Sequence, residues 1–382
     1  MPEKLKILQV NKLYHPWIGG VETHVKDLSE KLVCQPHINL NVLVCNDKYQ
    51  NVEETINGVK VTKLANIVCL LFKKVLLFSM PISLAFANNL KKFKADIIHI
   101  HLPNPLAVVS YLWSRPKGKL VLMWHSDIIK QKTIMFFYKP ILNIILKKAD
   151  VILTTSPNMV KNSLFLQEYK NKTVVVPLGI NPDLYEFPKD KSESLRSERE
   201  KYGDKIVLYV GRFTYYKGVK YLLDAVKDID GHLIMIGDGY LLPEIEEQIK
   251  KEKISSKVTI LPPLEFEKLV YYYHLCDVFV LPSIARSEAF GIVQLESMIC
   301  GKPVVSTDLP TGVPFVNEHN KTGFVVSPKS SDELAKAINT LLSDKELRDK
   351  MGDYAEQRVR KTFTNDMLMQ RILKIYDDLS RK

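Results

Sequence analysis

Long apolar runs are missing from this chain of 382 residues. A membrane-spanning helix needs about 20 predominantly apolar residues. The nearest stretch, residues 64–87, is interrupted by Lys73, Lys74 and Pro81, and central lysines cost roughly 2.5–3.5 kcal/mol each on membrane insertion. The first residues also lack the apolar core of a secretory signal. These absences argue against a spanning or exported protein and predict a cytoplasmic location.

Cysteine is sparse and scattered. The five cysteines are an odd number and include no C-x-x-C pair, which argues against a disulfide framework and a structural zinc site. The one D-x-D sequence, Asp228 to Asp230, precedes a glycine at a predicted helix end and is interpreted as surface. We therefore predict neither a metal site nor a resident cofactor.

The net charge of +11 is concentrated in the first half of the chain. Residues 1–180 carry 24 Lys and Arg against 11 Asp and Glu, whereas the remainder carries 30 against 32. A basic surface suits an anionic membrane, an anionic lipid or a nucleic acid; a general enrichment in lysine is the plain alternative. No stacking-aromatic platform or nucleic-acid motif accompanies the lysines, so nucleic acid is not an expected partner.

One basic stretch, residues 128–148, mixes aromatic and aliphatic side chains with five lysines. Such a composition suits a helix or helix pair that lies in the lipid headgroup region. The alternative is a helix that faces the core and extends its lysines to solvent.

Short Val, Ile and Leu runs alternate with helical patterns along the whole chain, which is typical of parallel sheets covered on both faces. The predicted strands are 6–10, 40–45, 59–64, 97–101, 120–124, 151–155, 173–176, 206–210, 233–236, 258–261, 278–281, 304–306 and 323–326. The predicted helices include 21–32, 81–93, 189–201, 332–342, 344–361 and 365–379.

Residues 177–188 contain three prolines and a glycine and predict a linker between domains. We therefore expect a first Rossmann-like domain over residues 1–180, a second over 189–364, and a terminal helix over 365–382 that returns to the first domain. Two such α/β domains would face each other across a cleft at the carboxyl ends of their strands, where doubly wound sheets bind ligands.

The motif Gly211-Arg212-Phe-Thr-Tyr-Tyr-Lys217-Gly218 follows the predicted strand 206–210. Glycine lets the backbone turn tightly beside a ligand. The Arg212 guanidinium offers a bidentate fork for phosphate oxygens, and Lys217 adds a point charge. Two cations on one loop suit a diphosphate in the absence of a metal, whereas two solvated surface cations are the alternative.

A second motif runs from Pro282 to Glu296, after the predicted strand 278–281. We expect Gly291 to begin a helix whose first N–H groups face an anion. Glu288 would lie in the loop and Glu296 on the second helical turn, where their carboxylates could accept hydrogen bonds from sugar hydroxyls. Alternatively, Glu288 only caps the helix and Glu296 lies on the surface.

Two glycine pairs give weaker signals, because most such pairs are only turns. Gly19-Gly20 follows the first predicted strand, and Gly237-Asp238-Gly239 follows the strand at 233–236. Each would allow a loop to run close to a ligand.

Among the histidines, His125 follows the predicted strand 120–124 at the carboxyl edge of the sheet, which makes it a functional candidate. His99 and His101 lie inside an apolar run and are interpreted as core or edge histidines.

At these residues the sequence resembles the retaining glycosyltransferase family 4, whose members have the GT-B fold. The resemblance covers nearly the whole chain: GR-x4-KG, GDG, PS-x4-E-x-FG-x4-E and GKPVVSTD in the second half, and GGVE, DIIHIHLP and WHSD in the first. The stretch LPTGVPFVN is similar to enzymes that build bacterial surface polysaccharides.

The resemblance implies roles for individual residues. Arg212 and Lys217 would bind the donor's diphosphate, Glu288 the sugar hydroxyls and Glu296 the ribose, and His125 would contact the transferred sugar. With the base near Leu264, further donor contacts would be Gly19, Gly20, Gly211, Gly237, Asp238, Leu264, Phe290, Gly291 and Ile292.

The resemblance also implies a reaction. A sugar would move from GDP-mannose or a UDP-sugar to a lipid-linked or saccharide acceptor, with retention of configuration, in bacterial surface polysaccharide or lipopolysaccharide synthesis. The enzyme would lie on the cytoplasmic face of the inner membrane as a peripheral protein. A nucleotide-sugar epimerase with a similar two-domain architecture is the alternative.

Overall fold

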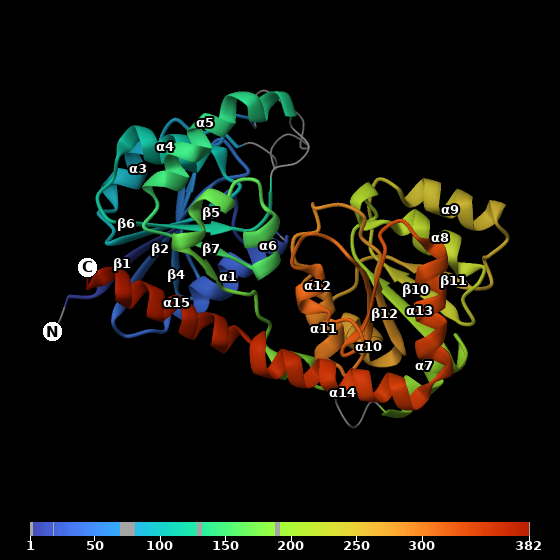
Figure 1. Ribbon diagram of the computed structural model, residues 1–382. Coiled ribbons are helices and arrows are strands. Elements are labelled where there is room, and N and C mark those ends of the chain that lie inside the picture. Colours follow the sequence, from blue (N-terminus) through green and yellow to red (C-terminus); the bar gives the residue numbers. More distant parts are fainter. Residues whose placement is uncertain (1–2, 18, 69–80, 128–131, 188–191, 382) are drawn as a thin grey trace. The chain divides into compact units, whose positions relative to one another are not determined.

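The computed structural model describes residues 3–17, 19–68, 81–127, 132–187 and 192–381. The chain divides into two compact units (Figure 1). Unit 1 comprises Met1–Leu178 and Asn365–Lys382, and unit 2 comprises Gly179–Thr364. Parts of four stretches singled out from the sequence, 64–87, 128–148, 177–188 and 189–201, lie outside the described residues.

Unit 1 contains a sheet of eight described strands in the order β3-β4-β2-β1-β5-β6-β7-β8. All neighbours pair in parallel except β3 and β4. The strands are β1 (Leu5–Val10), β2 (Ile38–Cys45), β3 (Val52–Ile56), β4 (Val59–Leu64), β5 (Ile97–Leu102), β6 (Lys119–Trp124), β7 (Val151–Thr154) and β8 (Thr173–Val175). Strand β3 was not predicted, although Asn57 and Gly58 adopt the positive φ angles of a tight hairpin turn and Asn-Gly is a strong hairpin signal.

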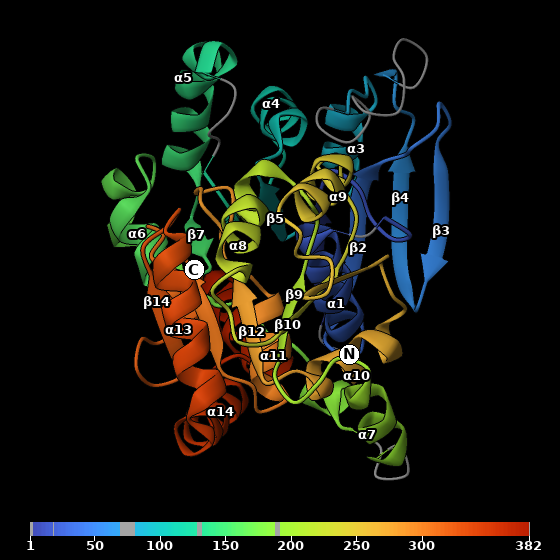
Figure 2. The same ribbon diagram turned by 90° about the vertical axis from the view of Figure 1, so that its right-hand side faces the viewer.

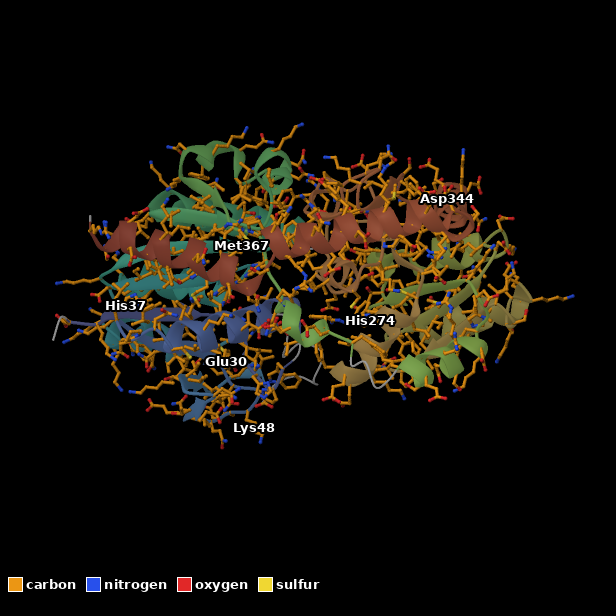
Figure 3. The ribbon with its side chains drawn as sticks, turned by 90° about the horizontal axis from the view of Figure 1, so that it is seen from below. Glu30, His37, Lys48, His274, Asp344 and Met367 are labelled. Atoms are coloured by element: carbon orange, nitrogen blue, oxygen red, sulfur yellow. The ribbon has the colours of Figure 1, made fainter. Side chains whose placement is uncertain are left out.

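Helices cover both faces of this sheet, and central strands such as β5 and β6 are buried on both faces. On one face, α3 (Phe86–Lys92), α4 (Pro105–Ser114) and α5 (Lys132–Lys148) pack on side chains such as Leu8, Ile100 and Leu122. The opposite face carries α1 (Gly20–Val33) and the terminal helix α15 (Asn365–Ser380), which lie side by side (Figure 3). The short helix α6 (Pro157–Asn162) follows β7. The helix predicted over 81–93 is wrong at its start, because residues 81–85 are not helical.

Unit 2 contains a parallel sheet of six described strands in the order β11-β10-β9-β12-β13-β14. The strands are β9 (Ile206–Val210), β10 (His232–Ile236), β11 (Val258–Leu261), β12 (Val278–Leu281), β13 (Val304–Thr307) and β14 (Gly323–Val326). Helices α8 (Val219–Val226), α9 (Leu242–Lys251) and α13 (Ser331–Ser343) share one apolar core with the sheet (Figure 2). The remaining helices are α7 (Ser192–Glu200), α10 (Phe266–Leu275), α11 (Val293–Ile299), α12 (Val313–Val316) and α14 (Lys345–Thr362).

The two strand orders place a switch point in each unit, between β1 and β5 and between β9 and β12. At such a point the crossovers leave in opposite directions, and ligands bind outside the carboxyl ends of the strands. All the candidate residues that follow β6, β9, β10, β11 and β12 therefore lie on the ligand-binding edges of their sheets.

The segment predicted as a linker is packed. Ile180 and Tyr185 are buried, a short 3₁₀ helix spans Pro182–Tyr185, and Ile180 pairs with Thr364 where the chain leaves unit 2. None of the described helices is long and apolar enough to span a membrane.

Candidate active site

The loop after β9 packs directly on the loop after β12. Gly218 ends this first loop with a φ of +69°, and a Cβ there would lie 2.0 Å from the carbonyl oxygen of Pro282. Only glycine fits such a left-handed, crowded position without strain. The contact brings Lys217 from the first motif against Glu288 from the second.

Lys217 and Glu288 form a buried ion pair. Lys217 Nζ lies 2.6 Å from Glu288 Oε2, and the two side chains are 11% and 10% exposed. The Ser283 hydroxyl donates a second hydrogen bond of 2.9 Å to the same oxygen. Two residues that were predicted to bind the nucleotide-sugar donor therefore contact each other. The Glu288 carboxylate is paired and is not a free nucleophile.

A cavity of about 430 Å³ opens at the carboxyl ends of β9, β10 and β11, within the size range of small-molecule sites. Its lining includes the predicted residues Gly211, Arg212, Gly237, Asp238 and Leu264. A Cβ at Gly237 would lie 2.0 Å from the carbonyl oxygen of Gly211, so this glycine lets the β9 and β10 loops meet. The Arg212 guanidinium is exposed and makes no ion pair or hydrogen bond with any described residue.

The expectation that Gly291 begins a helix is wrong. Gly291 has a φ of +71°, and α11 starts at Val293, because a left-handed residue cannot continue a right-handed helix. Glu296 consequently lies in the first turn instead of the second. The backbone N–H groups of Phe290, Gly291 and Ile292 donate to no acceptor among the described residues. These three adjacent N–H groups therefore have no partner within the described protein, and a ligand's oxygens could satisfy them.

Glu296 is held in place by a tyrosine. The Tyr273 hydroxyl donates a hydrogen bond of 2.5 Å to Glu296 Oε2. Burial raises the pKa of the Glu296 carboxyl, and the hydrogen bond from Tyr273 lowers it again in part. Burial also raises the pKa of Tyr273, which keeps the hydroxyl a donor. Glu296 is thus a fixed acceptor and not a loose surface residue.

In unit 1, His125 follows β6 and is 5% exposed. Its Nε2 atom lies 2.9 Å from Nδ1 of His101. Burial lowers the pKa of His125 well below its usual range, so the ring is neutral at pH 7.

The glycine pair of unit 1 begins α1. Gly19 is its extended N-cap residue, and a Cβ added at Gly20 would meet nothing within 4 Å. Packing within the unit therefore does not require glycine at position 20.

Two family models match the chain in succession. Residues 18–184 match Glycosyltransferase Family 4, and residues 190–358 match Glycosyl transferases group 1. The O-antigen chain mannosyltransferase C of Escherichia coli is 34% identical over 79% of this chain and 81% of its own. The D-rhamnosyltransferase WbpZ of Pseudomonas aeruginosa is 34% identical over 71% of this chain and 70% of its own. This chain belongs to glycosyltransferase family 4.

The glycosyltransferase has the GT-B fold. Sucrose-phosphate synthase from Thermosynechococcus elongatus superposes with a TM-score of 0.81 at 21% identity, over 98% of this chain and 99% of that one. HepE from Anabaena, solved in complex with UDP-glucose, superposes with a TM-score of 0.78 at 21% identity, over 98% and 100% of the two chains.

Sequence reasoning missed the contact between His101 and His125 in this glycosyltransferase, and the contact between Gln9 and His101. His101 is buried, as interpreted, but it also contacts His125, and its Nε2 lies 2.6 Å from Oε1 of Gln9. The sequence contained an indication of these contacts, because Gln9, His99 and His101 interrupt mostly apolar strands. In the structure, Gln9 is in register with His99. Polar residues two positions apart share one face of a strand.

Three histidines offer a place where a metal ion could bind. Ring nitrogens of His24, His101 and His125 all lie within 4.8 Å of one another, and the buried His24 Nε2 has no hydrogen-bond partner in the described protein. Both nitrogens of His101 already make hydrogen bonds, so a metal ion would have to displace one of them. The absence of a metal site stays a prediction.

Proposed function

We propose that this glycosyltransferase transfers a hexose from a nucleoside-diphosphate sugar to a saccharide or lipid-linked acceptor in surface polysaccharide synthesis. The observation that carries the proposal is a group of cations and N–H donors on one sheet edge of unit 2: the exposed Arg212, the buried Lys217 and the unpaired N–H groups of residues 290–292. GDP-mannose is the first candidate donor and a UDP-sugar the second. The mannosyltransferase and rhamnosyltransferase relatives support the polysaccharide assignment.

The chemistry follows from these groups. Cleavage of the anomeric C–O bond leaves negative charge on the departing diphosphate, which fixed cations and N–H donors stabilise without reorganisation. Glu288 is paired with Lys217 and Ser283, which disfavours a covalent intermediate on that carboxylate. We propose that the acceptor oxygen bonds to the anomeric carbon on the face that the phosphate leaves. The hydroxyl proton passes to the departing phosphate oxygen, and configuration is retained.

An assay of nucleoside diphosphate release tests the function. The protein is incubated with GDP-mannose or UDP-glucose, with and without a saccharide acceptor, and the products are separated by chromatography. We expect release that depends on the acceptor and continues in EDTA, because Arg212 and Lys217 serve in place of a metal. An epimerised donor formed without acceptor would instead support an epimerase.

The assignment of Glu296 to the ribose is tested separately by calorimetry with GDP and UDP. Glu296→Ala should weaken nucleotide affinity about ten- to hundredfold, because it removes a hydrogen bond to a charged group. Glu288→Gln should leave it close to wild type, because the sugar is absent from the product. Tyr273→Phe is the matched control, since it removes one hydrogen-bond partner of Glu296 and keeps the carboxylate. Equal weakening in the Glu288 and Glu296 variants would contradict the assignment.

We also propose that the outer surface of α4 and α5 binds an anionic membrane that carries the acceptor. Trp113, Phe136 and Phe137 are 84%, 77% and 72% exposed, although α5 packs its inner face in the core. These two neighbouring helices stand at one edge of unit 1 (Figure 1). Exposed lysines at 139, 147 and 148 accompany the aromatic side chains. Aromatic and basic residues on one face suit the headgroup region.

Vesicle sedimentation tests this surface. The wild-type protein should bind vesicles that contain phosphatidylglycerol more tightly than pure phosphatidylcholine. Phe136→Ser with Phe137→Ser should weaken binding by at least about tenfold, since each buried phenylalanine contributes roughly 1.5–3 kcal/mol. Leu184→Ser, a change at an exposed apolar residue of unit 2, is the control. Unchanged binding by the double variant would refute the assignment of this surface.

A further inference from the structure

A chain of buried hydrogen bonds runs through unit 1 from the terminal helix to His125. The Tyr376 hydroxyl on α15 lies 2.7 Å from His99 Nδ1 and accepts a 3.0 Å hydrogen bond from Gln9 Nε2. Gln9 Oε1 lies 2.6 Å from His101 Nε2, and His101 Nδ1 lies 2.9 Å from His125 Nε2. The first four residues are at most 1% exposed, so water does not compete for these bonds.

Because the imidazole rings in this line of hydrogen bonds are neutral, the donor and the acceptor of each bond can be assigned. Burial lowers the pKa of His99 to about 3 and of His101 well below its usual range. A neutral imidazole has one N–H donor and one acceptor. Gln9 turns its amide N–H₂ toward Tyr376 and His99, so its oxygen accepts from His101 Nε2. His101 Nδ1 must then accept, and the proton between the two rings belongs to His125 Nε2.

The proton on Nε2 determines which hydrogen bond the second ring nitrogen of His125, Nδ1, can make. This Nδ1 atom makes no hydrogen bond to a described residue. It is also not one of the solvent-inaccessible side-chain atoms that lack a hydrogen-bond partner. With the proton on Nε2, this open nitrogen carries a lone pair. It would accept a hydrogen bond from a hydroxyl and could not donate one to a carbonyl or phosphate oxygen.

We propose that Gln9 and Tyr376 are positioning residues that hold His125 in its Nε2–H tautomer, so that Nδ1 accepts a hydrogen bond from a sugar hydroxyl of the donor. The second half of this statement rests on the proposed function and on the family resemblance, which implies that His125 contacts the transferred sugar. The first half concerns unit 1 alone and is measured without substrate.

Long-range proton–nitrogen NMR spectra of protein labelled with ¹⁵N-histidine report each tautomer, and His125→Gln identifies the His125 signals. In the wild type we expect protonated Nε2 and bare Nδ1. Gln9→Leu removes the link to His101, and Tyr376→Phe removes the anchoring hydroxyl while keeping the ring. Both should shift the His125 nitrogen signals toward a mixture of tautomers. Tyr138→Phe is the matched control, because that buried hydroxyl has no described partner.

Turnover should fall roughly five- to tenfold in Gln9→Leu and Tyr376→Phe, because each variant loses the net contribution of one hydrogen bond. The KM for the acceptor should stay unchanged. A His125 Nδ1–H tautomer in the wild type, or unaltered His125 signals in both variants, would overturn the positioning role. Shifted signals with full activity in both variants and in His125→Ala would instead remove His125 from the sugar site and leave the tautomer assignment standing.

Discussion

Replacing Lys217 with methionine removes half of a buried ion pair and keeps most of the side-chain volume. At an effective dielectric constant of about 20, unit charges 2.6 Å apart attract by about 6 kcal/mol. Desolvation of both charges cancels much of that attraction. Without Lys217, the Glu288 carboxylate stays buried with no counter-charge, which typically costs about 3–5 kcal/mol of folding stability.

Glu288→Gln should cost less, roughly 1.5–3 kcal/mol, because the amide oxygen still accepts from Lys217 and Ser283. The double variant leaves no buried charge. We therefore expect its cost to fall short of the sum of the single costs by about 2 kcal/mol. Lys345→Met, which breaks the exposed pair with Asp349, is the control and should cost less than about 1 kcal/mol.

Urea unfolding without donor measures these costs. Circular dichroism follows both units, whereas all three tryptophans, at positions 17, 113 and 124, lie in unit 1. The circular dichroism midpoint should fall while the tryptophan transition of the free protein stays close to wild type. Costs of the two single variants that add within about 0.5 kcal/mol would refute the coupling.

Three further predictions concern other parts of the molecule. Arg212→Ala should lower turnover on the order of 10²–10³-fold at an unchanged unfolding midpoint, because the side chain is exposed; a loss below tenfold in the release assay would contradict the diphosphate role. Gly218→Ala should destabilise unit 2 by more than about 2 kcal/mol in urea, since a left-handed alanine alone costs roughly 1–2 kcal/mol and its Cβ would clash with Pro282; wild-type stability would contradict the packing argument. Burial lowers the pKa of His24 to about 4 and of His99 to about 3. The stability that the neutral rings contribute is therefore fully present above the unfolded pKa of about 6.5 and is lost as the pH falls below it. We expect the free energy of unfolding to fall by about 2 kcal/mol per histidine between pH 7 and pH 5. Tryptophan fluorescence in urea at the two pH values measures the last effect, and equal midpoints would contradict it.

Local patterns in the sequence were sufficient for the fold class and the family. Every predicted strand is present, because continuous Val, Ile and Leu runs bounded by glycine, proline and charged residues have few other ways to be buried. Strand β3 was overlooked because its sequence, VEETI, is mostly exposed and lacks that signature. The predicted roles of Arg212, Glu288, Glu296 and His125 remain predictions.

The contacts within the candidate site were decided by tertiary structure alone. Lys217 meets Glu288 because β9 and β12 are neighbours at a switch point and Gly218 allows their loops to touch. Gln9, His101 and Tyr376 lie far apart along the chain, and only strand order, register and the return of α15 to unit 1 bring them to one line of hydrogen bonds. Residue spacing reports local periodicity, whereas a pairing of this kind depends on which strands become neighbours and on how closely their loops approach each other.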